Sequence, residues 1–270
     1  MPDIFDLLRK WWKQFLAVIL LSLLVVGIIT FLKPRQFLSV TTALPSSAFA
    51  ADKSTIFNEN LEILYSNLGT PDDLDMILGT ARLDTVYLLV ADQFNLFDHY
   101  KMKGAGEDLR NNAASMLKKN TRVLKSEYGE LKVKVWDTDK NLAPQLANAI
   151  MDELQAIHTS LKSAANAFTL KGLQDGLKKI SNDSINNQQG SAEGKKLTQD
   201  RAIQYEKLIS EYQLMVDSKP PALIIVEKAK ASSYPDRPRR LQIMTTTAIL
   251  SFLFSLLAVV YLERRKIFRQ

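Results

Sequence analysis

FLAVILLSLLVVGIITFL, residues 15–32, contains no charged side chain, and neither does IMTTTAILSFLFSLLAVVYL, residues 243–262. Each stretch approaches the ~20 residues that a helix needs to cross the ~30 Å hydrocarbon core of a bilayer. A helix that is apolar on every side over such a length is unusual in the core of a soluble protein. The sequence therefore predicts two transmembrane helices, one near each end of the chain.

The first apolar stretch has a second interpretation, as a cleaved signal peptide. Ala48-Phe49-Ala50 has the small residues of a cleavage site. However, the apolar run exceeds the ~7–15 residues of a signal-peptide core, and Ala50 lies far beyond its end. Trp11 and Trp12 precede the run and Tyr261 nearly ends the other one, as aromatic residues do at membrane interfaces. An uncleaved anchor is the better interpretation.

Basic residues flank both stretches on their terminal sides: Arg9, Lys10, Lys13, Arg264, Arg265, Lys266 and Arg269. Because positive residues collect on the cytoplasmic side, we expect the tails 1–14 and 263–270 to be cytoplasmic and residues 33–242 to lie outside. Tails this short leave no room for a cytoplasmic catalytic domain. Five cations on the outer flanks weaken the charge bias: Lys33, Arg35, Arg237, Arg239 and Arg240.

The overall composition restricts the chemistry that the chain can perform. The sequence has no cysteine, which excludes disulfides and cysteine-based metal or redox sites. The net charge of +6 arises from 35 basic and 29 acidic residues, and many of the basic ones border the apolar stretches. The positive charge is thus explained by membrane topology, and we expect no nucleic acid partner.

Between the apolar stretches the pattern is that of an α/β (α+β) domain. Alternating or β-branched runs predict three strands, at 37–44, 131–136 and 222–228. Helical periodicity predicts four helices before the long ones, at 58–67, 71–83, 85–94 and 108–120. Pro71 suits a first helical turn, and Asp72 and Asp73 favour a helix N-terminus. We expect the three strands to form one small sheet, reached from both membrane helices.

A long helical hairpin is expected at about residues 141–217. Apolar residues recur every three or four positions from Asn141 to Ile180, a helix of roughly 60 Å at ~1.5 Å per residue. Gly172 and Gly176 weaken its far end, and the polar residues 182–194 break it before a return helix at 197–216. The apolar stripe on both helices has two interpretations, an intramolecular seam or a contact with neighbouring subunits, and we expect both uses.

No catalytic constellation is apparent, so we expect neither an enzyme nor a metal ion or other cofactor. His99 and His158 are the only histidines and lack metal-ligand spacing, and Asp72, Asp73 and Asp75 fit a helix start better than a metal site. No phosphate-binding glycine loop is present. One basic run is interpreted as a solvated face, with contact to an acidic glycan or partner as the alternative: Lys118, Lys119, Arg122 and Lys125.

Three segments in order resemble the polysaccharide co-polymerase family, the Wzz-like chain-length determinants of bacterial surface glycans. Residues 77–96 (ILGTARLDTVYLLVADQFNL) resemble a family helix, and residues 132–154 (KVKVWDTDKNLAPQLANAIMDEL) its strand, acidic turn and following helix. Residues 226–240 (VEKAKASSYPDRPRR) resemble the strand and P-x-x-P element that precede the second membrane helix. The resemblance covers nearly the whole chain.

The sequence departs from the family pattern at several positions. Lys140 replaces a usual proline after the acidic turn, and Ile243 stands where the second membrane helix would begin with a serine. That helix also lacks the family's glycine; Ser251 and Ser255 form a small-xxx-small pair instead. Together with Gly27 in the first helix, these two serines are the expected positions of helix packing in the membrane.

The resemblance implies a non-enzymatic role in the bacterial inner membrane, with the domain in the periplasm. Such a protein would regulate the chain length of a surface polysaccharide, expected to be the O-antigen of lipopolysaccharide. It would act as a homo-oligomeric ring beside a membrane-embedded polymerase and its lipid-linked glycan, and a separate tyrosine kinase is a further candidate partner. A P-x-x-P element with adjacent arginines would orient the second helix: Pro235, Arg237, Pro238, Arg239 and Arg240.

A second interpretation is a periplasmic helical-hairpin scaffold or adaptor of a secretion, efflux or capsule export system. Such proteins have strand-rich halves beside the hairpin, and the sequence shows none. A two-pass sensor would need a cytoplasmic signalling domain, for which the expected tails are too short. The chain-length regulator is therefore the preferred hypothesis.

Overall fold

The structure is a computed structural model that describes residues 4–46, 71–104, 106–186 and 192–267. The helix expected at 58–67 and the Ala48-Phe49-Ala50 motif lie outside these ranges. The chain divides into two compact units. One unit comprises Met1–Leu38, Asp137–Lys140 and Ser232–Gln270, and the other contains the rest of the chain. Each unit is described by itself.

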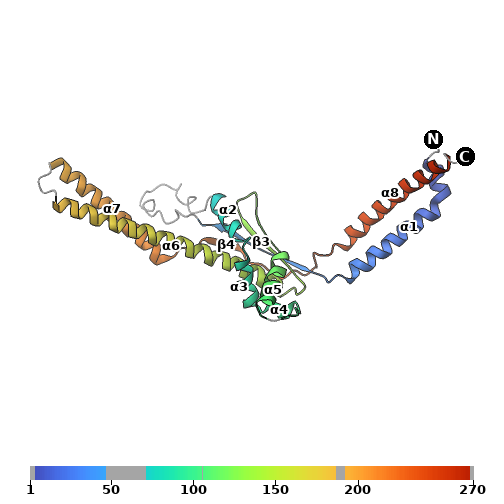
Figure 1. The fold of residues 1–270 in the computed structure, drawn as a ribbon, viewed down its shortest axis with the longest axis horizontal. Coiled ribbons are helices and arrows are strands. Elements are labelled where there is room, and N and C mark those ends of the chain that lie inside the picture. The colour runs from blue at the N-terminus through green and yellow to red at the C-terminus, as the bar shows by residue number, and fades with distance from the viewer. Residues whose placement is uncertain (1–3, 47–70, 105, 187–191, 268–270) are drawn as a thin grey trace. The chain divides into compact units, whose positions relative to one another are not determined.

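The first unit is built on two antiparallel helices, α1 (Ile4–Leu32) and α8 (Arg240–Ile267), which lie side by side (Figure 1). The rings of Phe15 and Phe252 are 5.9 Å apart, and Phe15 and Val259 are each 5% exposed. Elsewhere the helices expose their apolar side chains. The most apolar 18 residues within Arg9–Leu32 and within Arg240–Leu262 have mean hydropathies of 3.0 and 2.2, but only 11% and 17% of these windows is buried.

Such exposure distinguishes these helices from the core helices of soluble proteins, whose apolar side chains are covered by other elements. Both helices are long and apolar enough to cross a membrane. They also continue beyond the expected spans 15–32 and 243–262, since α1 begins at Ile4 and α8 reaches Ile267.

The second unit contains a four-stranded sheet in the order β2-β3-β1-β4. Its strands are β1 (Phe37–Pro45), which begins in the first unit, β2 (Thr121–Lys125), β3 (Leu131–Asp137) and β4 (Leu223–Glu227). Strands β1 and β4 pair antiparallel, and so do β2 and β3, which form a hairpin. Gly129 occupies its turn at a φ of +74°, a conformation that glycine adopts without strain.

The expectation of three strands was wrong because β2 was missed. Two of its five residues, Arg122 and Lys125, belong to the basic run, whose charge favours a solvated face rather than a strand. Thr121 pairs with Val135, and Lys125 with Leu131, so the strand is held by its partner β3. The α/β fold class itself is confirmed, since helices and one sheet make up this unit.

Within the described residues, four short helices accompany the sheet: α2 (Pro71–Thr80), α3 (Asp84–Gln93), α4 (Leu96–His99) and α5 (Glu107–Lys119). The expected helix at 71–83 ends three residues early in a turn, where the Arg82 N–H donates to the Gly79 carbonyl. The core joins the inward residues of β3 to those of the following helix. Its fully buried members include Leu131, Val133, Val135, Leu146, Ile150 and Leu154.

The expected hairpin consists of α6 (Leu142–Asn186) and α7 (Ala192–Ser218), which lie side by side (Figure 1). At ~1.5 Å per residue, the 45 residues of α6 extend about 67 Å. The apolar stripe is buried where α6 passes the sheet, but further along α6 Leu161 and Phe168 are 58% and 82% exposed. One half of α6 is thus a core helix, and the other leaves apolar side chains uncovered.

Candidate functional site at the proline–arginine junction

The candidate site is the junction between the sheet strands and the two terminal helices, formed by Arg35, Gln36 and residues 235–242. The Gln36 N–H donates to the Arg237 carbonyl at 2.9 Å. The Gln36 carbonyl accepts from the N–H groups of Asp236 at 2.9 Å and Arg237 at 3.3 Å. The segment that leaves α1 is therefore bonded directly to the segment that enters α8.

The two prolines determine where α8 can begin. Neither Pro235 nor Pro238 has an N–H to donate, and each fixes its own φ near −65°. The Arg240 N–H donates to the Pro238 carbonyl at 2.9 Å, and the Ile243 N–H to the Arg239 carbonyl at 3.0 Å. The helix starts two residues after Pro238, and the Arg237–Pro238 peptide bond is cis.

The arginines of the junction have different contacts. Arg239 Nη2 lies 3.0 Å from Asp236 Oδ1. Asp236 lies inside the P-x-x-P segment, and Arg239 is the residue that follows it. The Arg240 guanidinium lies 4.3 Å from the ring centroid of Phe31, a cation–π contact between the start of α8 and the end of α1. Arg35 and Arg237 are exposed. The backbone bridge and the cation–π contact together hold the two helices at this end.

A pocket of about 550 Å³ lies at the junction. Its nine lining residues are Arg35, Pro235, Asp236, Arg237, Pro238, Arg239, Arg240, Leu241 and Gln242. Four arginines and one aspartate give the lining a formal charge of +3. The pocket brings Arg35 together with the eight residues 235–242, about 200 positions further along the chain, a grouping that the sequence pattern did not reveal.

The serines expected to pack the membrane helices are buried in α8. Ser251 and Ser255 are 8% and 4% exposed, and their hydroxyls donate to the carbonyls of Ala248 at 3.0 Å and Phe252 at 2.8 Å. Since each hydroxyl is satisfied within its own helix, this face can be covered without an unpaired polar group. An added Cβ at Gly27 would meet no atom within 4 Å, so this glycine makes no close contact in the helix pair.

The basic run divides between two elements. Lys118, near the end of α5, donates to Asp84 Oδ1 at 2.7 Å and to the Arg82 carbonyl at 2.6 Å. Lys125, in β2, lies 3.2 Å from Asp75 Oδ1. The other two, Lys119 in α5 and Arg122 in β2, are exposed. Two of the four cations thus have carboxylate partners, which reduces the charge that this surface offers to an anionic ligand.

A partly buried polar cluster joins α2, α6 and the end of β1, and no pattern in the sequence indicates it. His158 Nε2 lies 2.8 Å from Thr80 Oγ1, and the Lys162 ammonium donates to the Ser46 carbonyl at 2.8 Å. Burial lowers the pKa of His158 and nearby Lys162 lowers it further, while Asp73 acts in the opposite direction. Burial also lowers the pKa of Lys162 against the effect of Asp73. The neutral imidazole is therefore favoured here.

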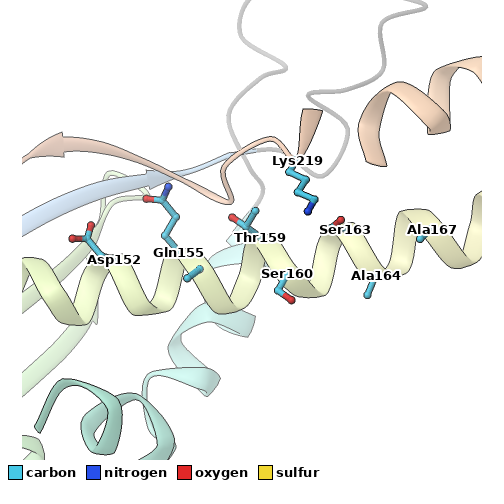
Figure 2. Close-up of a pocket in the computed structure, with 9 residues that line it drawn as sticks. Asp152, Gln155, Thr159, Ser160, Ser163, Ala164, Ala167 and Lys219 are labelled. Carbon is cyan, nitrogen blue, oxygen red and sulfur yellow. The ribbon is translucent and has the colours of Figure 1, made fainter. Parts of the chain in front are cut away.

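A groove of about 610 Å³ follows α6 from Asp152 to Ala167, with Lys219 projecting toward it (Figure 2). Its lining is made of small and polar side chains at helical spacing, and none of the nine described residues that line it is aromatic. Sugar rings commonly stack on aromatic side chains, so the groove does not have the lining of a glycan-stacking site. Among the residues that the structure describes, no group of three or more His, Asp and Glu side chains could hold a metal ion.

No family model and no curated protein matches this sequence. Among solved structures, a full-length bacterial polysaccharide co-polymerase is similar over 98% of this chain and 98% of its own, with 11% identity and a TM-score of 0.43. A fragment of WzzB, the polysaccharide co-polymerase from Salmonella Typhimurium, is similar over 75% of this chain and 100% of its own, with 12% identity and a TM-score of 0.37. These similarities are distant, and the function proposed below rests on the chain's own elements.

Proposed function

We propose that the chain is a membrane-anchored regulator of surface polysaccharide length, of the polysaccharide co-polymerase type. The observation that carries this proposal is the path of the chain. An apolar helix leads into β1, a long hairpin follows, and β4 returns through Pro235-x-x-Pro238 to a second apolar helix. This is the order of elements that the resemblance of residues 77–96, 132–154 and 226–240 implies. The glycan is proposed to be the O-antigen of lipopolysaccharide.

The proposed role is mechanical rather than catalytic. Strands β1 and β4 pair with each other, and the junction bonds Gln36 to Arg237 between the same two chain segments. Both terminal helices are therefore connected to neighbouring strands of one sheet. A rearrangement of the sheet could pass to the membrane helices through these short segments, and from there to a glycan polymerase in the same membrane.

Self-association is part of the proposal, and the exposed apolar residues of the hairpin support it. Phe168 of α6 is 82% exposed, and Leu197 and Ile203 of α7 are 56% and 57% exposed. An amphipathic hairpin that leaves large apolar side chains uncovered favours contact with another chain. A second copy of the chain is the proposed partner. Each copy is proposed to span the inner membrane twice, with both termini in the cytoplasm and the hairpin in the periplasm.

Deletion of the gene followed by electrophoresis of the cell's surface polysaccharide tests the function. We expect a modal ladder in the parent and a random length distribution in the deletion strain, restored by the intact gene. An unchanged ladder would contradict the proposal for that glycan.

A variant pair then tests the junction in the same strain. Pro235→Ala with Pro238→Ala should fail to restore the modal length, because the entry to α8 is no longer constrained. Pro144→Ala is the matched control, since Pro144 lies in the first turn of α6, where the N–H that proline lacks has no partner within the helix in any case. Restoration by both variants would show that the prolines do not set the length.

The scaffold or adaptor remains the second candidate, supported by the hairpin alone. The described residues contain a single sheet of four strands, rather than strand-rich halves on both sides of a hairpin. A deletion that leaves the ladder intact but abolishes export of a capsule or another substrate would favour the adaptor.

A further inference from the structure

The junction end of the terminal helices carries more positive charge than its proposed side of the membrane predicts. Cations normally collect at the cytoplasmic ends of membrane helices, and the far ends are poor in them. Here five stand at the far end: Lys33, Arg35, Arg237, Arg239 and Arg240. Such a cluster of cations at the far end of the helices is suited to binding an anionic ligand.

The junction pocket concentrates this charge. Asp236 is the one acidic group among its nine described lining residues, against four arginines. Asp236 lies 3.0 Å from Arg239, so it offsets one of the four charges. Arg240 is held over the Phe31 ring at 4.3 Å, a contact that positions the guanidinium without neutralising it. The pocket thus keeps a formal charge of +3 in a volume of about 550 Å³.

The pocket also adjoins apolar surface. Phe31 and Leu32, in the last turn of α1, are 61% and 79% exposed, and Leu241, in the first turn of α8, is 82% exposed. In a bilayer these residues would face acyl chains, and the arginines would lie at the depth of the headgroups. Guanidinium groups bind phosphate oxygens through paired N–H donors, which makes arginine the preferred partner of phosphate.

We propose that the junction pocket binds the phosphate of a membrane lipid headgroup, with Arg35 and Arg240 as its principal ligands. A lipid fits better than free phosphate because the cations border exposed apolar side chains, which acyl chains would cover. The proposal rests on the membrane placement of α1 and α8 and not on control of glycan length. A lipid-binding assay therefore fails or succeeds independently of the polysaccharide ladder.

The test is native mass spectrometry of the full chain in a neutral detergent, titrated with phosphatidylglycerol. Phosphatidylcholine is the control for apolar binding, and inorganic phosphate is the control for a free anion. Arg35→Gln with Arg240→Gln removes the two principal ligands. Arg9→Gln with Lys13→Gln removes two exposed cations at the other end of α1 and is the matched variant.

We expect saturable binding of phosphatidylglycerol that the Arg35/Arg240 pair weakens about 25-fold, at roughly a factor of five for each cation. The Arg9/Lys13 pair should bind within about twofold of the parent chain, because these two exposed cations do not line the pocket and are screened by solvent. Should the Arg35/Arg240 pair not fold, Arg35→Gln alone decides the question, with an expected loss of about fivefold.

Three results would overturn the proposal. Equal losses in the two variant pairs would mean non-specific attraction to the positive chain. Equal affinity for phosphatidylcholine would mean that the acyl chains alone account for binding. Inorganic phosphate that displaced the lipid at comparable concentration would identify an anion site with no preference for a membrane lipid.

Discussion

Two glycines one helical turn apart on α6 have different surroundings, and only one has a structural task. An added Cβ at Gly176 would lie 2.6 Å from Cε1 of Tyr205 in α7, whereas one at Gly172 would meet no atom within 4 Å. Gly176 therefore makes room for an aromatic ring between the two helices of the hairpin. Gly172 only weakens the helix, as its backbone freedom is lost on folding.

This difference predicts opposite effects of the same substitution. Gly172→Ala should stabilise the chain by about 0.5–1 kcal/mol, because alanine is the better helix former. Gly176→Ala should destabilise it by about 1–3 kcal/mol, because the Tyr205 ring must move. Thermal unfolding of the detergent-solubilised full chain measures both. With Tyr205→Ala in the background, Gly176→Ala should become stabilising; a persistent loss there would show that the ring is not the cause.

The buried His158 predicts a pH dependence of stability. Its pKa is lowered in the folded chain, chiefly by burial and then by Lys162. The histidine of the unfolded chain binds a proton near pH ~6.5, whereas His158 in the folded chain resists protonation. The contribution of His158 to the free energy of unfolding is therefore fully present above that pH. It is lost as the pH falls through the lower folded pKa. Unfolding temperatures should thus decrease from pH 7.5 to 5.

Substitution of His158 by glutamine should flatten this decrease, since an amide does not titrate and can still bond to Thr80. The comparison is made on the full chain across the same pH range. His99→Gln supplies the matched variant, because His99 lies in α4, outside the polar cluster. If both variants flatten the curve equally, the pH dependence does not come from the cluster.

At the scale of the elements, the packing of α8 against α1 depends on small side chains. Ser251 and Ser255 are buried, while Thr246 of the same helix is exposed. Ser255→Leu should destabilise the helix pair by about 1–3 kcal/mol, because a leucine overfills the contact. Thr246→Leu should change stability by less than about 0.5 kcal/mol. Equal effects in thermal unfolding would place Ser255 outside the contact between these helices.

Some helices and strands could be predicted from the sequence and others could not, and the reason lies in how each element is stabilised. The long helix α6 and strand β3 have strong periodic patterns because one face of each is buried in the core. Strand β2 has five residues, lies at the sheet edge and is at best half-buried, so its apolar alternation is weak. Pairing with β3 decides that it is a strand, and pairing is not a local property.

At the scale of the whole molecule, the proposed self-association can be tested directly because the chain has no cysteine. A single Phe168→Cys should form a disulfide-linked dimer on mild oxidation in membranes, since this exposed position lies on the proposed contact surface of the hairpin. Tyr128→Cys is the control, because Tyr128 is 86% exposed and belongs to the β2–β3 turn rather than to the hairpin α6–α7. Equal cross-linking at both positions would mean random collision.

The mass of the solubilised protein gives the companion measurement. A particle several times the 30.5 kDa of one chain is expected after the detergent contribution is subtracted. A strict monomer under these conditions, with no cross-link at position 168, would contradict the proposed ring.

The two apolar helices, the hairpin and the α/β class could be predicted from the sequence, because length, hydropathy and periodicity are properties of contiguous residues. Which distant residues meet depends on the tertiary structure. It paired Lys118 with Asp84, placed Tyr205 against Gly176, and joined His158 to Thr80. It also gathered Arg35 with the arginines that precede α8. These contacts follow from the surfaces that folding brings together, which no local pattern in the chain records.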